Sequence, residues 1–406
     1  MGRASAPVGV PGARRGPAVE VAEIFRAHGA RYRQTHAPSR VQRRAMRAIE
    51  TCRTAALGGH RHTCDACGAE RIRYNSCRNR HCPKCQPLAK ERWLDARRAE
   101  LLPVEYFHVV FTLPHALNPL AQSHPRLLYT LLFHAAADTL ATFARDPRHL
   151  GGALGVSAIL HTWGQNLSQH VHLHCVVTGG ALALDGSRWI PAKAGFLFPV
   201  RALAKVFRGK FLDALRRAFE SHKLLFAGSL TPLAEPTAFA AWLAKLRRHE
   251  WVVYAKPPFA GPEQVLQYLG RYTHRVALSN ERLVALQDGV VHLRWKDYAD
   301  GDRVKVMALG AQEFIRRFLL HVLPDGFVRI RHFGLLANRT RTAKLARCRH
   351  LLAQPPQAPR PEPESLHALM LRLSGIDIER CPVCQRGRLR ITEVLPPVSA
   401  PVWDTS

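Results

Sequence analysis

The chain is poor in acidic residues and lacks the motifs of several common enzyme classes. Of its 406 residues, 30 are Asp or Glu and 59 are Lys or Arg, which gives a formal net charge of +29 at pH 7. No G-x-x-x-x-G-K-S/T loop occurs, so we expect no ATP-driven chemistry. No H-E-x-x-H pattern occurs either, which argues against a zinc hydrolase. Any catalytic activity must therefore depend on residues outside these two motifs.

Long apolar stretches are missing as well. We find no uninterrupted apolar run of membrane-spanning length and no signal-peptide core behind the first arginines, so we expect a cytoplasmic protein with no membrane partner. The hydrophobic content of 47% is nevertheless enough for a packed core. The excess positive charge is spread along the chain and indicates a long polyanion as partner. Nucleic acid is the first candidate, which predicts association with the nucleoid rather than a small-molecule substrate.

Composition and periodicity divide the chain into four parts. Residues 1–20 are rich in Pro, Gly, Ala and Arg and predict a flexible basic lead. Residues 21–100 combine helical patterns with most of the cysteines, and residues 101–352 alternate predicted strands with helices. In this larger part an amphipathic pattern predicts one helix over about residues 119–144, and Asp288 with Gly289 predicts a hairpin turn. A Pro-rich linker then opens the C-terminal tail over 353–406. We therefore expect an α+β protein in which a small helical and zinc-binding domain precedes the larger domain.

Two C-x-x-C pairs stand in the first domain. Cys64, Cys67, Cys82 and Cys85 have fourteen residues between the pairs, which is typical of a four-cysteine structural zinc site. In a reducing compartment this grouping favours zinc over disulfides, with unpaired reduced cysteines as the alternative. Cys77, together with His62 and His81, leaves the ligand set open.

A third C-x-x-C pair lies in the C-terminal tail. Cys381 and Cys384 have the spacing of half a zinc site and predict a possible second zinc. Its other ligands do not follow from the local sequence. Cys348 and His350 are candidates by proximity along the chain.

The run QHVHLHCVVTGG at residues 169–180 has the alternation of a β-strand that ends in a turn. Side chains alternate across a strand, so His170, His172 and His174 should project from one face. Neutral imidazoles without partners are unsatisfied polar groups, and protonated ones repel each other. A shared metal ion is the simplest stabilising arrangement. Such a site would leave coordination positions for a substrate oxygen.

Two tyrosines recur one helical turn apart in residues 264–275, a segment whose first-turn Pro262 favours a helix. Tyr268 and Tyr272 would share one face, about 6 Å apart along the axis. Two half-buried core aromatics are the structural alternative. Beside a metal ion in a basic protein, a tyrosine oxygen can attack a DNA phosphorus and form a 5′-phosphotyrosine link with a free 3′-hydroxyl. Exchange of one phosphodiester for another conserves bond energy.

Four stretches together resemble the two-tyrosine HUH transposases of the insertion sequence 91 family, where U is a hydrophobic residue. They are SCRNRHCPKCQ at 76–86, the histidine strand running into TGG at 178–180, YLGRYTHRVALSN at 268–280 and GLLANR at 334–339. The resemblance covers about residues 20 to 350. It implies a central antiparallel sheet flanked by helices, preceded by a zinc-binding domain.

The resemblance also implies roles for individual residues. His172 and His174 would be the metal ligands, and Tyr268 and Tyr272 the nucleophiles that cleave and transfer single-stranded DNA in rolling-circle-like transposition. The third ligand is expected from Gln165 or His170, with Gln165 slightly favoured. The catalytic ion is expected to be Mg or Mn and the cysteine-bound ion a structural Zn.

Arg271, His274 and Arg275 flank the tyrosines and could hold the DNA backbone, although arginines on helices are often simply solvated.

The partner is expected to be single-stranded DNA at the element ends and the target. A rolling-circle replication initiator or relaxase is the nearest alternative, although the chain has no helicase. A catalytically inactive zinc-dependent DNA-binding regulator is the alternative from another class.

Overall fold

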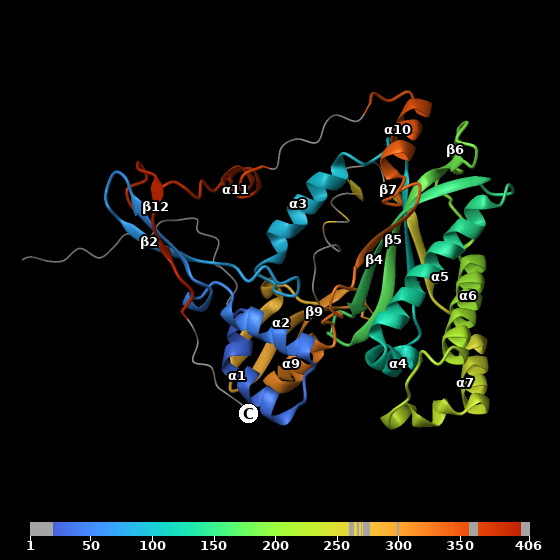
Figure 1. The fold of residues 1–406 in the computed structure, drawn as a ribbon, viewed down its shortest axis with the longest axis horizontal. Helices are drawn as coiled ribbons and strands as arrows, with labels where there is room; N and C mark the ends of the chain where they lie inside the picture. The colour runs from blue at the N-terminus through green and yellow to red at the C-terminus, as the bar shows by residue number, and fades with distance from the viewer. Residues whose placement is uncertain are drawn as a thin grey trace, which may run out of the picture.

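The structure, a computed structural model, has an α+β architecture built on antiparallel sheets (Figure 1). It describes residues 19–259, 264, 265, 268, 270, 277–298, 300–356 and 364–398. Every strand pairing in these residues is antiparallel. The expected fold class is confirmed.

The largest sheet carries the histidine strand in its interior. Its order is β11-β4-β5-β3-β7, and β6 pairs with β5 outside this path. The strands are β3 (Tyr106–Thr112), β4 (Gly152–Trp163), β5 (Gln169–Ala183), β6 (Trp189–Pro191), β7 (Val253–Phe259) and β11 (Ile330–Gly334). Strand β5 lies between β4 and β3, so its side chains are flanked on both sides by neighbouring strands. This central position explains how the imidazoles can be buried.

Helices cover one face of this sheet, on the right in Figure 1. They are α4 (Asn118–Ser123), α5 (Pro125–Arg145), α6 (Val200–Glu220) and α7 (Pro236–Arg248). Val171, Leu173 and Cys175 of β5 are buried in the core that these helices share with the sheet. The single helix expected over residues 119–144 is two helices. The chain leaves helical geometry at His124, where φ is −125°, and a new helix begins at Pro125.

By length and composition alone, α5 is the one described helix that could cross a membrane. Half of its apolar window is buried, and Leu128, Leu132 and Phe133 belong to the core beneath the sheet. The apolar composition of α5 is therefore explained by its packing.

A second core joins the N-terminal helices to a small sheet from the second half of the chain. Helices α1 (Val21–Thr35) and α2 (Arg40–Thr51) pack with α9 (Ala311–Leu319) and with the sheet β10-β9-β8. The strands are β8 (Leu283–Gln287), β9 (Val290–Asp297) and β10 (Arg303–Gly310). Asp288 and Gly289 form the predicted hairpin turn with φ of 49° and 75°, a conformation that suits glycine.

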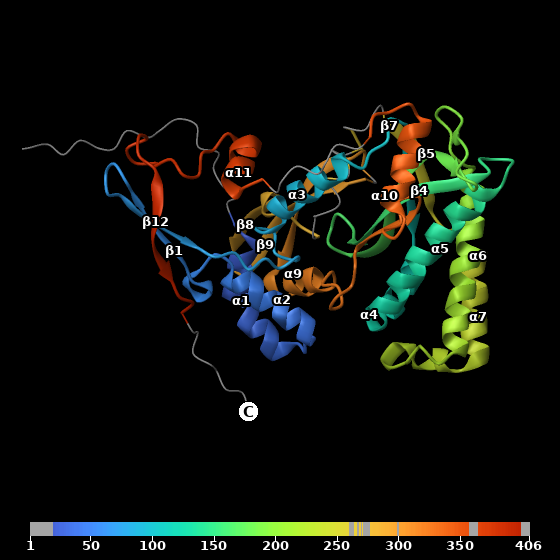
Figure 2. The ribbon, with the colours of Figure 1, turned by 45° about the horizontal axis from the view of Figure 1, so that its top comes forward.

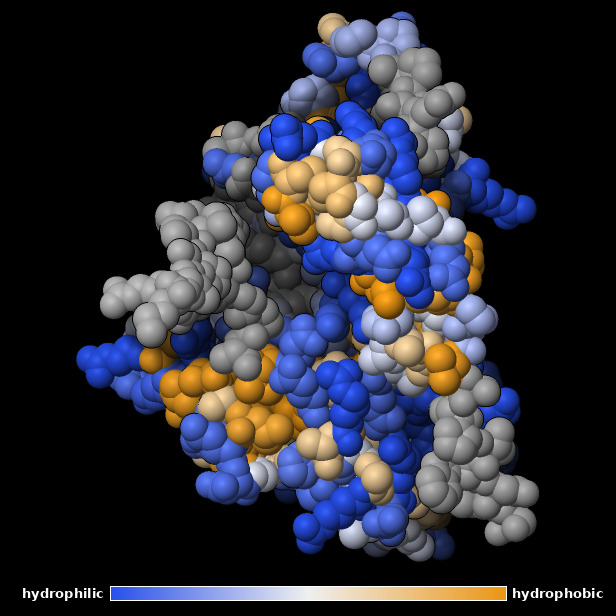
Figure 3. Space-filling model, turned by 90° about the vertical axis from the view of Figure 1, so that its left-hand side faces the viewer, coloured by the Kyte–Doolittle hydropathy of each residue, from blue (hydrophilic) through white to orange (hydrophobic). Residues whose placement is uncertain are grey.

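The third sheet unites distant parts of the sequence. Its order is β12-β1-β2, formed by β1 (Gly59–Cys64), β2 (Glu70–Tyr74) and β12 (Leu389–Leu395). It lies beyond the N-terminal helices from the central sheet, with α11 (Leu366–Ser374) beside it (Figures 1 and 2). The face of the molecule turned to the viewer in Figure 3 combines hydrophilic surface with apolar patches. Ile391 and Val394 of β12 are exposed.

Helix α3 (Gln86–Arg98) begins after Cys85 and packs on the face of the central sheet that α5 and α6 leave uncovered. Leu94 packs there with Val265, and also with Ile159 of β4 and Val176 of β5. Helix α10 (Arg341–Leu351) lies at the end of the sheet, where Leu345 packs with Leu182 of β5. Helix α3 therefore borders the sheet face onto which His172 and His174 project.

Candidate metal centre and tyrosine nucleophile

Three imidazoles converge on the sheet face that borders α3. His172 and His174 extend from β5, and His161 lies directly opposite His172 on β4. One ring nitrogen from each lies within 4.8 Å of the others. The ring centroids of His161 and His174 are 4.4 Å apart, and those of His172 and His174 are 4.8 Å apart. This arrangement can hold one metal ion.

Burial keeps these imidazoles in the form that binds metals. The pKa of His172 is lowered to about 3 by burial, with a smaller contribution from the charge of His170. Burial also lowers the pKa of His174 well below its ordinary value, and the neighbouring His161 adds to this. The Nδ1 of His172 lies 2.9 Å from the carbonyl oxygen of His170 and donates to it. His172 is then the tautomer whose Nε2 carries the lone pair for a metal.

Tyr268 reaches this cluster through a fourth histidine. His108 of β3 is buried, and its Nε2 lies 2.8 Å from Nδ1 of His174. The Tyr268 hydroxyl lies 2.8 Å from Nδ1 and 2.9 Å from Nε2 of the His108 ring. Burial lowers the pKa of His108 to about 3, and the charge of Lys256 contributes. A phenol oxygen is thus held against the histidine cluster.

Close packing against α3 positions the tyrosine segment. Gln264, Val265, Tyr268 and Gly270 are helical, in agreement with the helix expected there. A Cβ at Gly270 would lie 2.9 Å from Leu94 Cδ1 and 3.0 Å from Lys90 Cε, so the absence of a side chain permits the approach. Of the other residues expected to act here, Tyr272, Arg271, His274 and Arg275 lie outside the described residues.

The third imidazole of the cluster differs from both residues expected to complete the metal site. Gln165 donates its side-chain Nε2 to the Tyr298 hydroxyl at 3.1 Å, and His170 pairs with His115 at 3.1 Å. His161 takes the place beside His172 and His174. The reason is register, because the bend after Trp163 removes Gln165 from the strand while His161 pairs with His172 across it. Sequence reasoning missed His161 and His108 because each comes from a different strand.

The predicted combination of Cys64 and Cys67 with Cys82 and Cys85 also requires correction. The structure separates the two pairs into different clusters, of which the first contains Cys82, Cys85, Cys52 and Cys77. The second contains Cys64, Cys67, Cys381 and Cys384. The reason is that β1 and β2 form a hairpin that carries the first pair away from the second. The local spacing of the pairs could not reveal this.

The cluster of Cys52, Cys77, Cys82 and Cys85 suits a zinc ion. Its Sγ atoms lie 3.7 Å apart between Cys52 and Cys85 and 3.6 Å apart between Cys77 and Cys85. A tetrahedron with Zn–S bonds of about 2.3 Å has sulfur to sulfur edges of about 3.8 Å. Cys85 is also the N-cap of α3, so a bound ion would anchor the helix that packs against Gly270.

Neither nearby histidine joins a cysteine cluster. The Nε2 of His81 accepts from the backbone N–H of Leu323, and His62 contacts the carbonyl of His60 through Nδ1. Cys348 lies in a separate apolar cluster on α10, so it is not near Cys381 and Cys384.

Comparison with known proteins identifies the family. A family model described as "Putative transposase" matches residues 155–344, and one described as "Transposase zinc-binding domain" matches residues 24–113. The chain is 56% identical over 399 residues to "Putative transposase y4qJ" of Sinorhizobium fredii (strain NBRC 101917 / NGR234), covering 97% of this chain and all of that one. It is 28% identical to the transposase for insertion sequence element IS801 of Pseudomonas savastanoi pv. phaseolicola, over 82% of this chain and 79% of that one.

No solved structure matches the chain. The match at 56% identity over 97% of this chain and the two family models, which match separate parts of the chain, agree on one assignment. The chain belongs to the insertion sequence 91 family of transposases, with DNA as its partner and an N-terminal zinc-binding domain before the transposase domain.

Proposed function

We propose that this transposase cleaves and rejoins single-stranded DNA through 5′-phosphotyrosine intermediates, with Tyr268 and Tyr272 as nucleophiles. The observation that carries the proposal is the contact of the Tyr268 hydroxyl with His108, which is itself bonded to His174 of the histidine cluster. A phenol that only filled a core would not need a polar chain leading to three convergent imidazoles. The proposed partners are the single-stranded element ends and the target strand.

The proposed metal site consists of His161, His172 and His174. A divalent ion, which we propose to be Mg or Mn, would polarise the scissile phosphate when bound there. The three imidazoles supply neutral nitrogen donors, and the His170 carbonyl orients one of them. His108 holds the phenol at the edge of the site. Lys256, its register partner on β7, adds positive charge beside the place where a phosphate would bind.

In the proposed step, the Tyr268 oxygen forms a bond to phosphorus and the bond from phosphorus to the 3′ oxygen breaks. The phenol proton is transferred overall to the 3′ oxygen, so the products are a 5′-phosphotyrosine and a 3′-hydroxyl. Attack of a 3′-hydroxyl on the same phosphorus restores the tyrosine and joins two strands. Because one phosphodiester replaces another, no ATP is consumed. A second tyrosine would allow donor and target strands to be held in turn.

The exposed surface supplies charge for a nucleic-acid strand. Arg40, Arg43 and Arg47 lie exposed on α2, and Arg294 lies exposed on β9. Guanidinium groups of this kind bind phosphates without reading the base sequence. We propose that Arg271, His274 and Arg275, which flank the tyrosines in the sequence, contact the backbone near the cleavage point.

The test is a cleavage assay with labelled single-stranded oligonucleotides from the element ends, in Mg or Mn. The product expected on a denaturing gel is protein linked to the 5′ side of the cut. The adduct should disappear when Tyr268→Phe and Tyr272→Phe are combined, and in His172→Ala.

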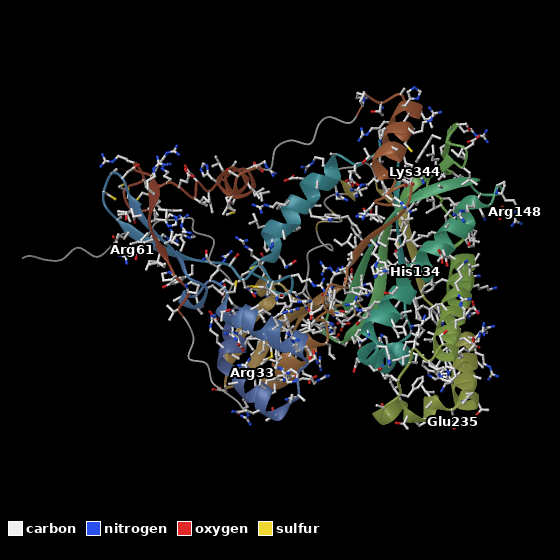
Figure 4. All side chains as sticks on the ribbon, in the orientation of Figure 1. Arg33, Arg61, His134, Arg148, Glu235 and Lys344 are labelled. Carbon is white, nitrogen blue, oxygen red and sulfur yellow. The ribbon has the colours of Figure 1, made fainter. Side chains whose placement is uncertain are left out.

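Two matched controls separate chemistry from folding. Tyr254→Phe changes an exposed tyrosine on β7. His134→Ala changes an exposed histidine on α5 (Figure 4), a helix that packs on the sheet face opposite to the histidine cluster. Both variants should form the adduct as the parent chain does. DNA binding without an adduct, across varied ends and metals, would instead favour an inactive DNA-binding regulator.

A further inference from the structure

The second cysteine cluster joins the N-terminal zinc-binding domain to the C-terminal tail. Cys64 is the last residue of β1 and Cys67 lies in the turn after it, whereas Cys381 and Cys384 precede β12. The Sγ atoms of Cys64 and Cys384 are 3.7 Å apart, although the two residues are separated by 320 positions. Those of Cys67 and Cys381 are 3.8 Å apart. The matched zinc-binding domain ends at residue 113, so it contains only half of this cluster.

The sulfur positions match a metal ion and do not match disulfides. All four Sγ atoms lie within 4.8 Å of one another. The two separations of 3.7 and 3.8 Å equal the edge of about 3.8 Å expected for four thiolates around zinc. A disulfide requires a sulfur to sulfur distance of about 2.05 Å, which is far shorter.

The two C-x-x-C segments have the same local turn. The carbonyl of Cys64 accepts from the backbone N–H of Gly68, and the carbonyl of Cys381 accepts from that of Gln385, each at 3.0 Å. The residue that follows each pair's second cysteine has positive φ, 71° at Gly68 and 57° at Gln385. A backbone N–H also donates to a sulfur in each turn, from Ala66 to Cys64 at 3.4 Å and from residue 387 to Cys384 at 3.3 Å. Two equivalent turns facing each other are the geometry of a four-cysteine zinc site.

The backbone around the cluster is shaped for close approach of the two turns. A Cβ at Gly387 would lie 2.4 Å from Cys64 Sγ and 2.6 Å from Ala66 Cβ, so only glycine fits there. Asp65 and Arg388 exchange two hydrogen bonds, because Asp65 Oδ1 accepts from the Arg388 N–H at 2.7 Å and the Arg388 carbonyl accepts from the Asp65 N–H at 3.0 Å. These contacts bring the turns together across the two ends of the chain.

From these observations we propose a second structural zinc ion, bound by Cys64, Cys67, Cys381 and Cys384, that fastens the C-terminal tail to the N-terminal zinc-binding domain. The tail then supplies β12 to the sheet, where Arg61 of β1 forms ion pairs with Glu70 at 3.1 Å and with Glu393 of β12 at 2.9 Å (Figure 4). The tail is thereby part of the folded domain. The proposal is independent of the cleavage chemistry.

The fastened tail also contacts the helix that borders the catalytic face. Arg372 of α11 donates to Asp95 of α3 at 2.8 Å, and the carbonyl of Ile378 accepts from Arg73 of β2 at 2.6 Å. Helix α3 also packs against Gly270, two residues from Tyr268. Removal of the second ion would therefore weaken the contact between Arg372 and Asp95, which holds the tail against this helix.

The test counts zinc per full-length chain by elemental mass spectrometry. The double variant Cys381→Ser with Cys384→Ser should lose one ion, and so should Cys64→Ser with Cys67→Ser. The quadruple variant should still lose only one, because both pairs hold the same ion. Cys348→Ser, which changes a buried cysteine outside both clusters, should lose none.

Combination with the other cluster gives the outcome that discriminates between pairings. Cys82→Ser with Cys85→Ser, added to the Cys64 and Cys67 changes, should remove two ions. Loss of only one ion would mean that Cys64, Cys67, Cys82 and Cys85 share an ion, and it would overturn the proposal. Retention of all zinc in the Cys381 and Cys384 double variant would also overturn it.

A second measurement covers variants that fail to fold. With cobalt in place of zinc, Cys384→His should keep the ion while the thiolate to cobalt absorption decreases by the share of one sulfur. The histidine cluster contributes no thiolate absorption, so it does not interfere. An unchanged thiolate band in Cys384→His would contradict the ligand assignment.

Discussion

The substitution Gly387→Ala places a single methyl group into the second cysteine cluster. Its Cβ would lie 2.4 Å from Cys64 Sγ and 2.8 Å from Asp65 Oδ1, whereas ordinary contacts begin near 3.4 Å. The turn that carries Cys64 must therefore move by about 1 Å, while metal sites tolerate deviations of about 0.2 Å in their bond lengths. Overpacking of this kind costs about 1–3 kcal/mol. At 1.4 kcal/mol per decade, the zinc affinity of this cluster should fall roughly ten- to hundredfold.

The assay is competition for zinc with a coloured chelator. As chelator is added, the colour reports how much zinc remains in the more weakly binding of the two cysteine clusters. Gly209→Ala on α6 is the matched control, because its Cβ would meet no atom within 4 Å. In that helix position alanine should leave zinc affinity unchanged and raise the free energy of unfolding by about 0.5–1 kcal/mol. A Gly387→Ala chain with the zinc affinity of the parent would refute the reasoning.

Three other predictions concern histidines. His161→Ala should reduce metal affinity and adduct formation by roughly 100-fold or more, since it removes a ligand, whereas His170→Ala should have a much smaller effect; equal losses in metal titrations would contradict the assignment. His108→Phe removes the contact with Tyr268 and should slow adduct formation about tenfold at saturating metal and DNA, with DNA binding unchanged in a filter assay. Burial lowers the pKa of His321 to about 4, so the folded state disfavours protonation and loses stability as pH falls from about 6.5 towards 4, by up to about 3 kcal/mol. His321→Gln should flatten that part of the pH dependence of urea unfolding, and an unchanged slope would disprove it.

Much of the fold followed from local pattern. The alternation in residues 169–180 predicted a strand with histidines on one face, and β5 confirms it with Val171, Leu173 and Cys175 in the core on the other. Turn chemistry at Asp288 and Gly289 likewise predicted the β8 to β9 hairpin. Local signals succeed here because hydrophobic periodicity and turn conformations are determined by neighbouring residues.

The expected helix over residues 119–144 failed for an equally local reason. A Pro at residue 125 cannot donate its backbone nitrogen, so α4 ends at Ser123 and α5 starts anew. The amphipathic pattern continued through the break because both helices bury leucines in the same core. Periodicity alone therefore joined two elements into one.

By itself, the sequence determined the α+β class, the family, the placement of His172 and His174 on one strand face, and the presence of a cysteine-rich zinc-binding domain, because each depends on residue types at short spacing. Only the tertiary structure decided which residues meet. His161 reaches the histidine cluster through the register of β4 with β5, and Cys381 and Cys384 reach Cys64 and Cys67 through the pairing of β12 with β1. Strand pairing brings these partners together across 11 residues for His161 and His172 and across 320 for Cys64 and Cys384, and no spacing within a motif encodes such a pairing.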